Sequence, residues 1–168
     1  ISGEAMSGHV AVFVDGENIS AGQATAIRKI ASGHGTVDVA RVYGNAAAQP
    51  KWDGQPGFRF IHSGTGKNAT DILLTVQAME AALSGSFAVV VIASSDRDFT
   101  HLATRIRELG ITVVGIGETK AAEQFRAACT CFVVVASAVA KPVVNVVPAP
   151  PKPDTRAPKA GPLDLKLR

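Results

Sequence analysis

Residues 87–99, FAVVVIASSDRDF, decide the fold class of this chain. They begin with a continuous apolar run rich in β-branched residues, which is typical of a strand covered on both faces. The run ends at residue 94, and two carboxylates follow it at Asp96 and Asp98. Strands covered on both faces occur in parallel sheets flanked by helices. The stretch therefore predicts an α/β domain with acidic side chains just beyond a strand.

Strand-like and helix-like segments alternate along the rest of the chain up to residue 136. Short apolar or alternating runs predict further strands at 9–14, 36–43, 58–62, 111–117 and 131–137. Helical periodicity and terminating glycines predict helices at 20–32, 69–85, 98–110 and 121–129. Six strands separated mostly by helices predict a three-layer α/β/α sandwich with a mainly parallel sheet.

Two of these connections carry more specific expectations. The helix at 69–85 has four apolar residues spaced as a face that packs into the core: Ile72, Val76, Met79 and Leu83. The loop at 44–57 contains three glycines and two prolines, and it has room for a short helix near Lys51–Trp52.

The two ends of the chain differ in composition from this body. Seven of the nine prolines fall between Pro142 and Pro162. From residue 136 onward six Lys and Arg stand against two Asp, a net charge of +4, whereas the first 135 residues hold eleven basic and twelve acidic side chains, a net charge of −1. We therefore expect a domain at 8–136, a disordered basic Pro-rich tail at 137–168, and a segment at 1–7 that is disordered or left from expression.

Composition also bears on location. No apolar run reaches the roughly eighteen residues that a membrane span needs, and the start lacks the basic region of a signal peptide. Cys129 and Cys131 are too close in sequence for a disulfide between them to cross-link distant parts of the fold. Such cysteine usage is typical of reduced intracellular proteins. We expect a cytoplasmic protein without a membrane partner.

Four carboxylates are expected to meet at one edge of the sheet. Asp15 ends the first strand, Asp96 and Asp98 follow a later one, and Asp71 lies in the first turn of a helix. Taken singly, each could cap a helix. Together they repel one another by about 4 kcal/mol per close pair at an effective dielectric of about 20, which a divalent cation would offset. An all-oxygen set of this kind favours Mg²⁺ or Mn²⁺ over zinc.

The motifs around these acids resemble the NYN domain family, the LabA-like branch of the PIN-like metal-dependent ribonucleases. The resemblance runs from about Val10 to Val135. Its motifs are VFVDGENIS at 12–20, GKNATDILL at 66–74, VVVIASSDRDF at 89–99 and FRAACTCFVVV at 125–135. It implies a PIN-like, Rossmann-like fold, an acidic site for Mg²⁺ or Mn²⁺, and endonucleolytic cleavage of RNA.

The resemblance also implies roles for individual residues. The acidic catalytic and metal-binding positions are matched by Asp15, Asp71, Asp96 and Asp98. The supporting positions around them are matched by Asn18 and Ser94, Ser95 stands beside them as a further supporting residue, and Lys67 matches a phosphate contact. The match departs from the family's pattern at Ser95, which replaces a glycine, at Arg97, which stands between two aspartates, and at Gln77 and Thr130, where carboxylates are common.

RNA, single-stranded or structured, is the partner that the resemblance implies. Cations on or near the loop edge are candidates for its phosphates: Lys67, Arg97, Arg41 and Lys51, with Arg59 and Lys120 nearby. Tyr43 and Trp52 are candidate stacking platforms for unpaired bases, although packing within its own loop explains Trp52 better. A homodimer and a protein partner bound through the tail are further interactions that the sequence leaves open.

Two other functions stand beside the endoribonuclease. A domain that keeps the fold but turns over poorly would act as an RNA- or protein-binding module, which Ser95, Arg97 and Gln77 favour and the intact Asp set opposes. A haloacid-dehalogenase-like phosphatase also places an Asp at the first strand end. It needs a second Asp two residues later, where this chain has Glu17, and it is a distant third.

Overall fold

The most apolar strands of the chain lie in the middle of its sheet. β1 (His9–Asp15) pairs in parallel with β2 (Thr36–Gly44) on one side and with β4 (Val89–Ala93) on the other. The outer strands are β3 (Arg59–His62), beside β2, and β5 (Thr112–Gly117) and β6 (Cys131–Val134), beyond β4.

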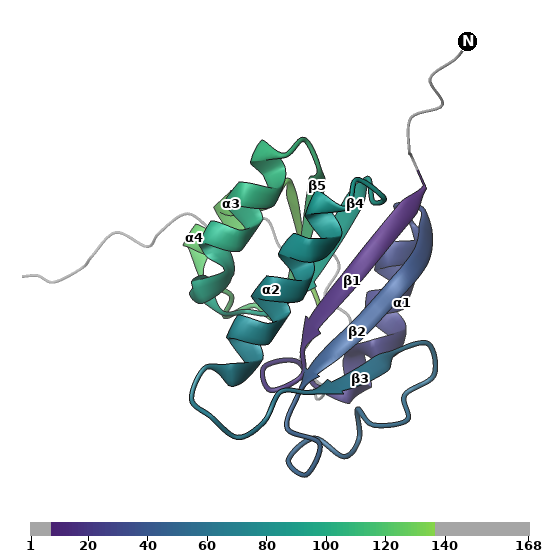
Figure 1. Cartoon of the computed structure of the whole chain (residues 1–168), viewed down its shortest axis with the longest axis vertical. Coiled ribbons are helices and arrows are strands. Elements are labelled where there is room, and N and C mark those ends of the chain that lie inside the picture. Colours follow the sequence, from purple (N-terminus) through teal and green to yellow (C-terminus); the bar gives the residue numbers. More distant parts are fainter. Residues whose placement is uncertain (1–7, 137–168) are drawn as a thin grey trace, which may run out of the picture.

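This computed structural model describes residues 8–136, so the expected segments at 1–7 and 137–168 lie outside the described residues. Within that range the six strands form one parallel sheet of order β3-β2-β1-β4-β5-β6 (Figure 1). None of the helices in that range is long and apolar enough to cross a membrane.

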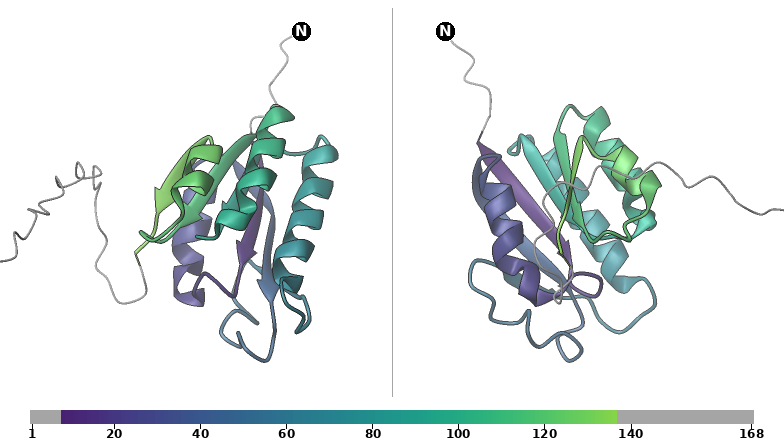
Figure 2. Two further views of the ribbon diagram at one scale, coloured as in Figure 1. Left: turned by 90° about the vertical axis from the view of Figure 1, so that its left-hand side faces the viewer. Right: turned by 180° about the vertical axis from the view of Figure 1, so that it is seen from behind.

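Helices cover both faces of the sheet. α1 (Ala24–Ser32) packs on one face, and α2 (Ala69–Leu83), α3 (Thr100–Glu108) and α4 (Glu123–Ala128) pack on the other (Figure 2). The 3-10 turns η1 (Ala21–Gln23) and η2 (Arg97–Phe99) lead into α1 and α3. The prediction of a three-layer α/β/α sandwich is therefore confirmed, and the carboxyl ends of all six strands share one edge.

The long loop between β2 and β3 packs on the α1 side of the sheet. Its Trp52 is buried, donates its indole N–H to the carbonyl of Ile19 at 2.7 Å and meets the ring of Phe58 edge-on. Trp52 therefore packs against Phe58 of its own loop, as expected, and against the segment after β1 as well. Because Trp52 and Tyr43 are both buried, the expectation that they stack on bases is wrong.

The short helix expected near Lys51–Trp52 is also absent, since residues 50–57 form successive turns. The glycines at 54 and 57 adopt positive φ, a conformation that cannot continue a helix. The loop is held by its buried tryptophan instead of by helical hydrogen bonds.

The face of α2 that packs into the core is not the one that the apolar spacing predicts. The buried residues of the helix are Thr70, Leu74, Ala78 and Ala82. Of the predicted set, Ile72, Val76 and Leu83 are 61%, 57% and 66% exposed. Both sets recur at helical spacing, and the small side chains of Ala78 and Ala82 let the helix lie close to the sheet. The prediction of a buried face is therefore wrong for Ile72, Val76 and Leu83, whereas Met79 is half-buried and packs against the core.

Candidate functional site

The strand order of the sheet reverses between β1 and β4. From β1 the chain proceeds outward through β2 to β3, and from β4 it proceeds the opposite way through β5 to β6. In open α/β sheets the crevice at such a reversal, beyond the carboxyl ends of the strands, is where ligands bind. Asp15 is the last residue of β1, and Ser94 directly follows β4, so both lie at the carboxyl ends of the two strands between which the order reverses.

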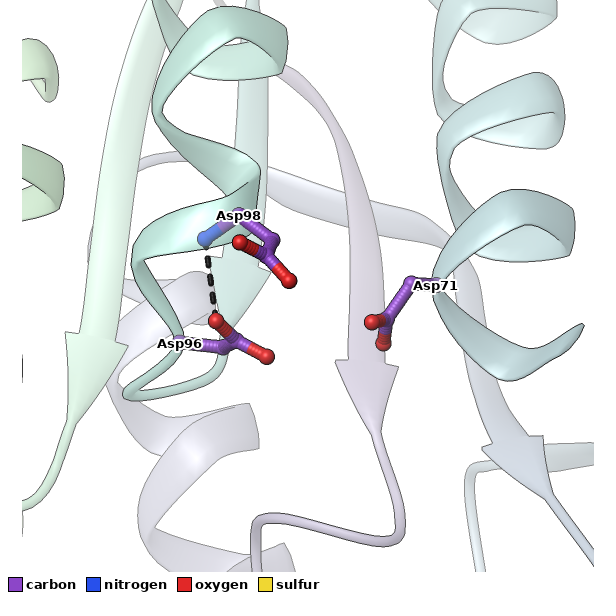
Figure 3. A group of neighbouring side chains, drawn as sticks. All are labelled: Asp71, Asp96 and Asp98. Carbon is purple, nitrogen blue, oxygen red and sulfur yellow. Dashed lines mark hydrogen bonds between the residues drawn. The ribbon is translucent and has the colours of Figure 1, made fainter. Parts of the chain in front are cut away.

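Three of the four predicted carboxylates converge there. Asp71, Asp96 and Asp98 each offer one oxygen, and these oxygens lie within 4.8 Å of one another. Figure 3 shows Asp71 reaching from the first turn of α2 toward the other two, which come from the segment after β4. No ion pair among residues 8–136 includes any of these three carboxylates. We call these three residues the Asp cluster.

The chemistry of the Asp cluster fits a hard divalent cation. All of its donors are carboxylate oxygens, and Asp98 is exposed while the other two are half-buried, so that the cluster is open to solvent. Burial, and then the negative charges of Asp96 and Asp98, raise the pKa of Asp71 above its ordinary value. The cluster is therefore strained electrostatically when all three acids are charged, and a cation would relieve that strain.

Asp15 lies next to the Asp cluster and is more deeply buried. One of its oxygens accepts from the hydroxyl of Ser94 at 3.2 Å, and the other accepts from the amide of Glu17 at 3.2 Å. Burial and then the charge of Asp71 raise the pKa of Asp15 to about 7, although both hydrogen bonds act in the opposite direction. The structure thus gathers three acids and adds a buried fourth; that Asp15 ligates a metal stays a prediction.

Hydrogen bonds fasten the segments that carry these acids to one another. The hydroxyl of Ser94, besides donating to Asp15, accepts from the amide of Asp96 at 3.1 Å. The side-chain oxygen of Asn18 accepts from the amide of Ser95 at 2.7 Å, which joins the loop after β1 to the loop after β4. Asp96 accepts from the amide of Asp98 at 2.9 Å, the bond drawn in Figure 3, and so caps η2 as well.

Gly117, at the end of β5, supports the same loop and was not among the residues expected from the sequence. A Cβ placed on it would lie 2.8 Å from the carbonyl oxygen of Ser94 and 3.0 Å from the hydroxyl of Ser95. That hydroxyl in turn accepts from the amide of Glu118 at 3.0 Å. In the sequence, Gly117 is visible only as a glycine at the end of an apolar strand. That pattern does not indicate that the loop after β4 lies against it.

Replacing Gly117 by Ala is therefore expected to displace the loop after β4 and to weaken Mn²⁺ binding about tenfold, as changes beside metal ligands do. Isothermal titration calorimetry with Mn²⁺ measures this. The matched control is Gly66→Ala, because the nearest atom to a Cβ there is 3.7 Å away. Equal affinities in the two variants would mean that the loop does not position the Asp cluster.

The predicted RNA contacts differ in how near they lie to the Asp cluster. Arg97 is exposed between two of its members, and Lys67 is exposed in the segment that leads into α2. Arg41 instead projects from β2 and donates to the side-chain oxygen of Gln77 at 3.0 Å, which also accepts from the hydroxyl of Tyr43 at 2.6 Å. Lys51 is exposed in the loop between β2 and β3.

Comparisons with known proteins agree with this architecture. The family model described as NYN domain matches residues 9–136. The crystal structure of a protein of unknown function from Vibrio parahaemolyticus superposes with a TM-score of 0.64 at 21% identity, covering 80% of this chain and 96% of that one. At that identity the likeness concerns the fold alone. No curated protein matches. Because the family model covers most of the chain, the chain belongs to the NYN domain family, a PIN-like ribonuclease-type domain.

Proposed function

We propose that this protein is a metal-dependent endoribonuclease that hydrolyses phosphodiester bonds of RNA at the Asp cluster. The observation that carries the proposal is the convergence of Asp71, Asp96 and Asp98 at the reversal point of the sheet, where none of the three forms an ion pair with another residue of the range 8–136. Membership of a nuclease-type family agrees with it. A structural role would explain each acid separately but gives no reason for three to meet.

Each residue of the cluster has a definite part in this proposal. Asp71, Asp96 and Asp98 hold Mg²⁺ or Mn²⁺. Asp15, which is hydrogen-bonded to Ser94 after β4, adds a fourth carboxylate beside them. When bound, such a cation would lower the pKa of a water molecule and neutralise charge that builds on the phosphoryl group. The exposed side chains of Lys67 and Arg97 flank the cluster in sequence and would contact phosphates of the substrate.

The proposal predicts that cleavage depends on the cation. End-labelled single-stranded RNA should be cut internally by the full chain in Mn²⁺ or Mg²⁺ and left intact in EDTA, and added Mn²⁺ should restore the activity. Gel electrophoresis of the labelled products measures this. Cleavage that continues unchanged in EDTA would contradict the proposal.

A second candidate function is that of an RNA-binding module with little turnover. The observation in its favour is Arg97, which is exposed and lies between Asp96 and Asp98 in the sequence, so that its positive charge would compete with a cation there. This candidate predicts retention of RNA on a filter in Mn²⁺ without the appearance of products. Arg97→Ala separates the two, because it should weaken RNA binding in both cases but raise metal affinity only if the arginine competes with the cation.

A further inference from the structure

The solvent-facing side of α2 is apolar over three turns. It consists of Ile72, Val76, Met79 and Leu83, which we call the α2 stripe; Met79 is half-buried and the other three are more than half exposed. In Figure 1, α2 lies in front of the sheet, and no other element of residues 8–136 covers it. The only charged residues in this fifteen-residue helix are Asp71 and Glu80.

A helix that is apolar all round is normally buried on both sides. Contiguous exposed apolar surface on a folded domain marks an interaction site more often than chance. We propose that the α2 stripe binds the α2 stripe of a second copy of this chain, the two helices packing antiparallel about a two-fold axis. The proposal is independent of the nuclease activity, because no residue of the stripe belongs to the Asp cluster.

The spacing of the stripe is the first reason to choose a second copy. Its residues follow one another by four, three and four positions, so the pattern is the same read in either direction along the helix. An antiparallel copy therefore sets Ile72 against Leu83 and Val76 against Met79 at both ends of the contact. This is the self-complementarity that a two-fold interface requires, and the alternation of three and four is the spacing of helix pairs.

Charge on one flank of α2 is the second reason. Arg41 and Arg59 are direct partners in the register of β2 and β3, and they line a hollow of about 410 Å³ together with Glu80 of α2. Two like charges opposite each other on neighbouring strands are unfavourable. Neither arginine, nor Glu80, belongs to an ion pair within the described residues.

A two-fold axis brings the same flank of both helices together. Glu80 of each copy then approaches Arg41 and Arg59 of the other copy in addition to the two arginines that line the same hollow in its own chain. The spacing of the apolar stripe thus selects a second copy in the antiparallel orientation, and each carboxylate of the flank then has arginines of both copies near it.

The chain's own C-terminal residues are a less suitable occupant. The last described residue, Ala136, accepts a hydrogen bond from the side chain of Gln23 in η1. Gln23 immediately precedes α1, and Val135 belongs to the core cluster on the α1 face. The described chain therefore ends on the face of the sheet opposite α2.

Sedimentation equilibrium of the full chain, from micromolar to hundreds of micromolar, tests the proposal. Wild-type protein should show a concentration-dependent dimer. Val76→Glu should weaken it at least about a hundredfold, because the symmetry places two carboxylates in one apolar contact. Gln124→Glu, which adds the same charge on the exposed side of α4, should leave it unchanged. A wild-type monomer at every concentration, or equal dimers in both variants, would overturn the proposal.

A cross-linking experiment tests the orientation separately and needs no charge in the interface. Oxidation of an equimolar mixture of Ile72→Cys and Leu83→Cys proteins should give a mixed dimer in preference to either self-dimer. The control is each variant mixed with wild type, which corrects for the exposed native Cys131. Preferential self-dimers would mean parallel helices and would overturn the antiparallel assignment.

Discussion

Asp96→Asn is expected to lower the rate of Mn²⁺-dependent RNA cleavage at least about a thousandfold. The change keeps the size of the side chain and leaves an oxygen that can still accept from the amide of Asp98, so the cap of η2 is preserved. What is lost is one negative charge of the three that converge at the Asp cluster. Several kcal/mol of charge stabilisation in the transition state depend on the cation held there, and each 1.4 kcal/mol or so is a factor of ten in rate.

The matched control is Asp53→Asn, which makes the same chemical change in the exposed loop between β2 and β3. Single-turnover cleavage of end-labelled RNA by the wild type and both variants, purified identically, measures the effect. Asp53→Asn should match the wild type within twofold or so. Equal rates in the wild type and Asp96→Asn would assign the activity to a contaminant or to another part of the chain.

The stability of the metal-free protein is expected to decrease as the pH rises from about 4 to about 7. Burial raises the pKa of Asp15 from 3.8 to about 7 in the folded state. Between these values the folded chain holds a proton that the unfolded chain has released, so raising the pH favours unfolding. Three pKa units correspond to at most about 4 kcal/mol, and the raised pKa of Asp71 acts in the same direction.

Urea unfolding in EDTA at a series of pH values measures this dependence. Asp15→Asn removes the buried ionisable group, so its free energy of unfolding should change less over the same range, whereas Asp53→Asn should behave as the wild type. Saturating Mn²⁺ should stabilise the wild type more above pH 7 than below pH 5 or so, because a cation binds the charged cluster. A flat profile for the metal-free wild type would show that Asp15 is charged at little cost.

The centre of the fold and the position of the acids follow from short stretches of sequence. The strands β1 and β4 are continuous apolar runs rich in β-branched residues, so both of their faces must be buried. A parallel sheet with helices on each side buries both faces of its strands. Asp15 is the last residue of β1, and Asp96 comes three positions after the end of β4. Their meeting at one edge is therefore a consequence of parallel topology, and the structure bears it out.

The packing face of α2 could not be chosen in the same way. Leu74, Ala78 and Ala82 repeat with the helical period, and so do Ile72, Val76 and Leu83 on the opposite side. Periodicity measures the spacing of apolar residues and not which of two apolar faces meets the sheet. The larger side chains were expected inside, but closeness to the strands selects the smaller ones.

The division of the four acids into three that converge and one that is buried also depends on tertiary contacts. Asp15 is buried, and its carboxylate accepts a hydrogen bond from the hydroxyl of Ser94, seventy-nine positions later. Arg41 likewise donates a hydrogen bond to Gln77 of α2. The sequence had suggested that Arg41 is a free cation near the site. Such pairs bring together residues from separate elements, and no local pattern encodes them.

The location of a bound cation tests the central claim most directly. Crystals of the full chain soaked in Mn²⁺ should give an anomalous diffraction peak in contact with the carboxylates of Asp71, Asp96 and Asp98, and the peak should be absent in Asp96→Asn crystals treated alike. A Mn²⁺ peak elsewhere with none at the Asp cluster, at concentrations that support cleavage, would contradict the account.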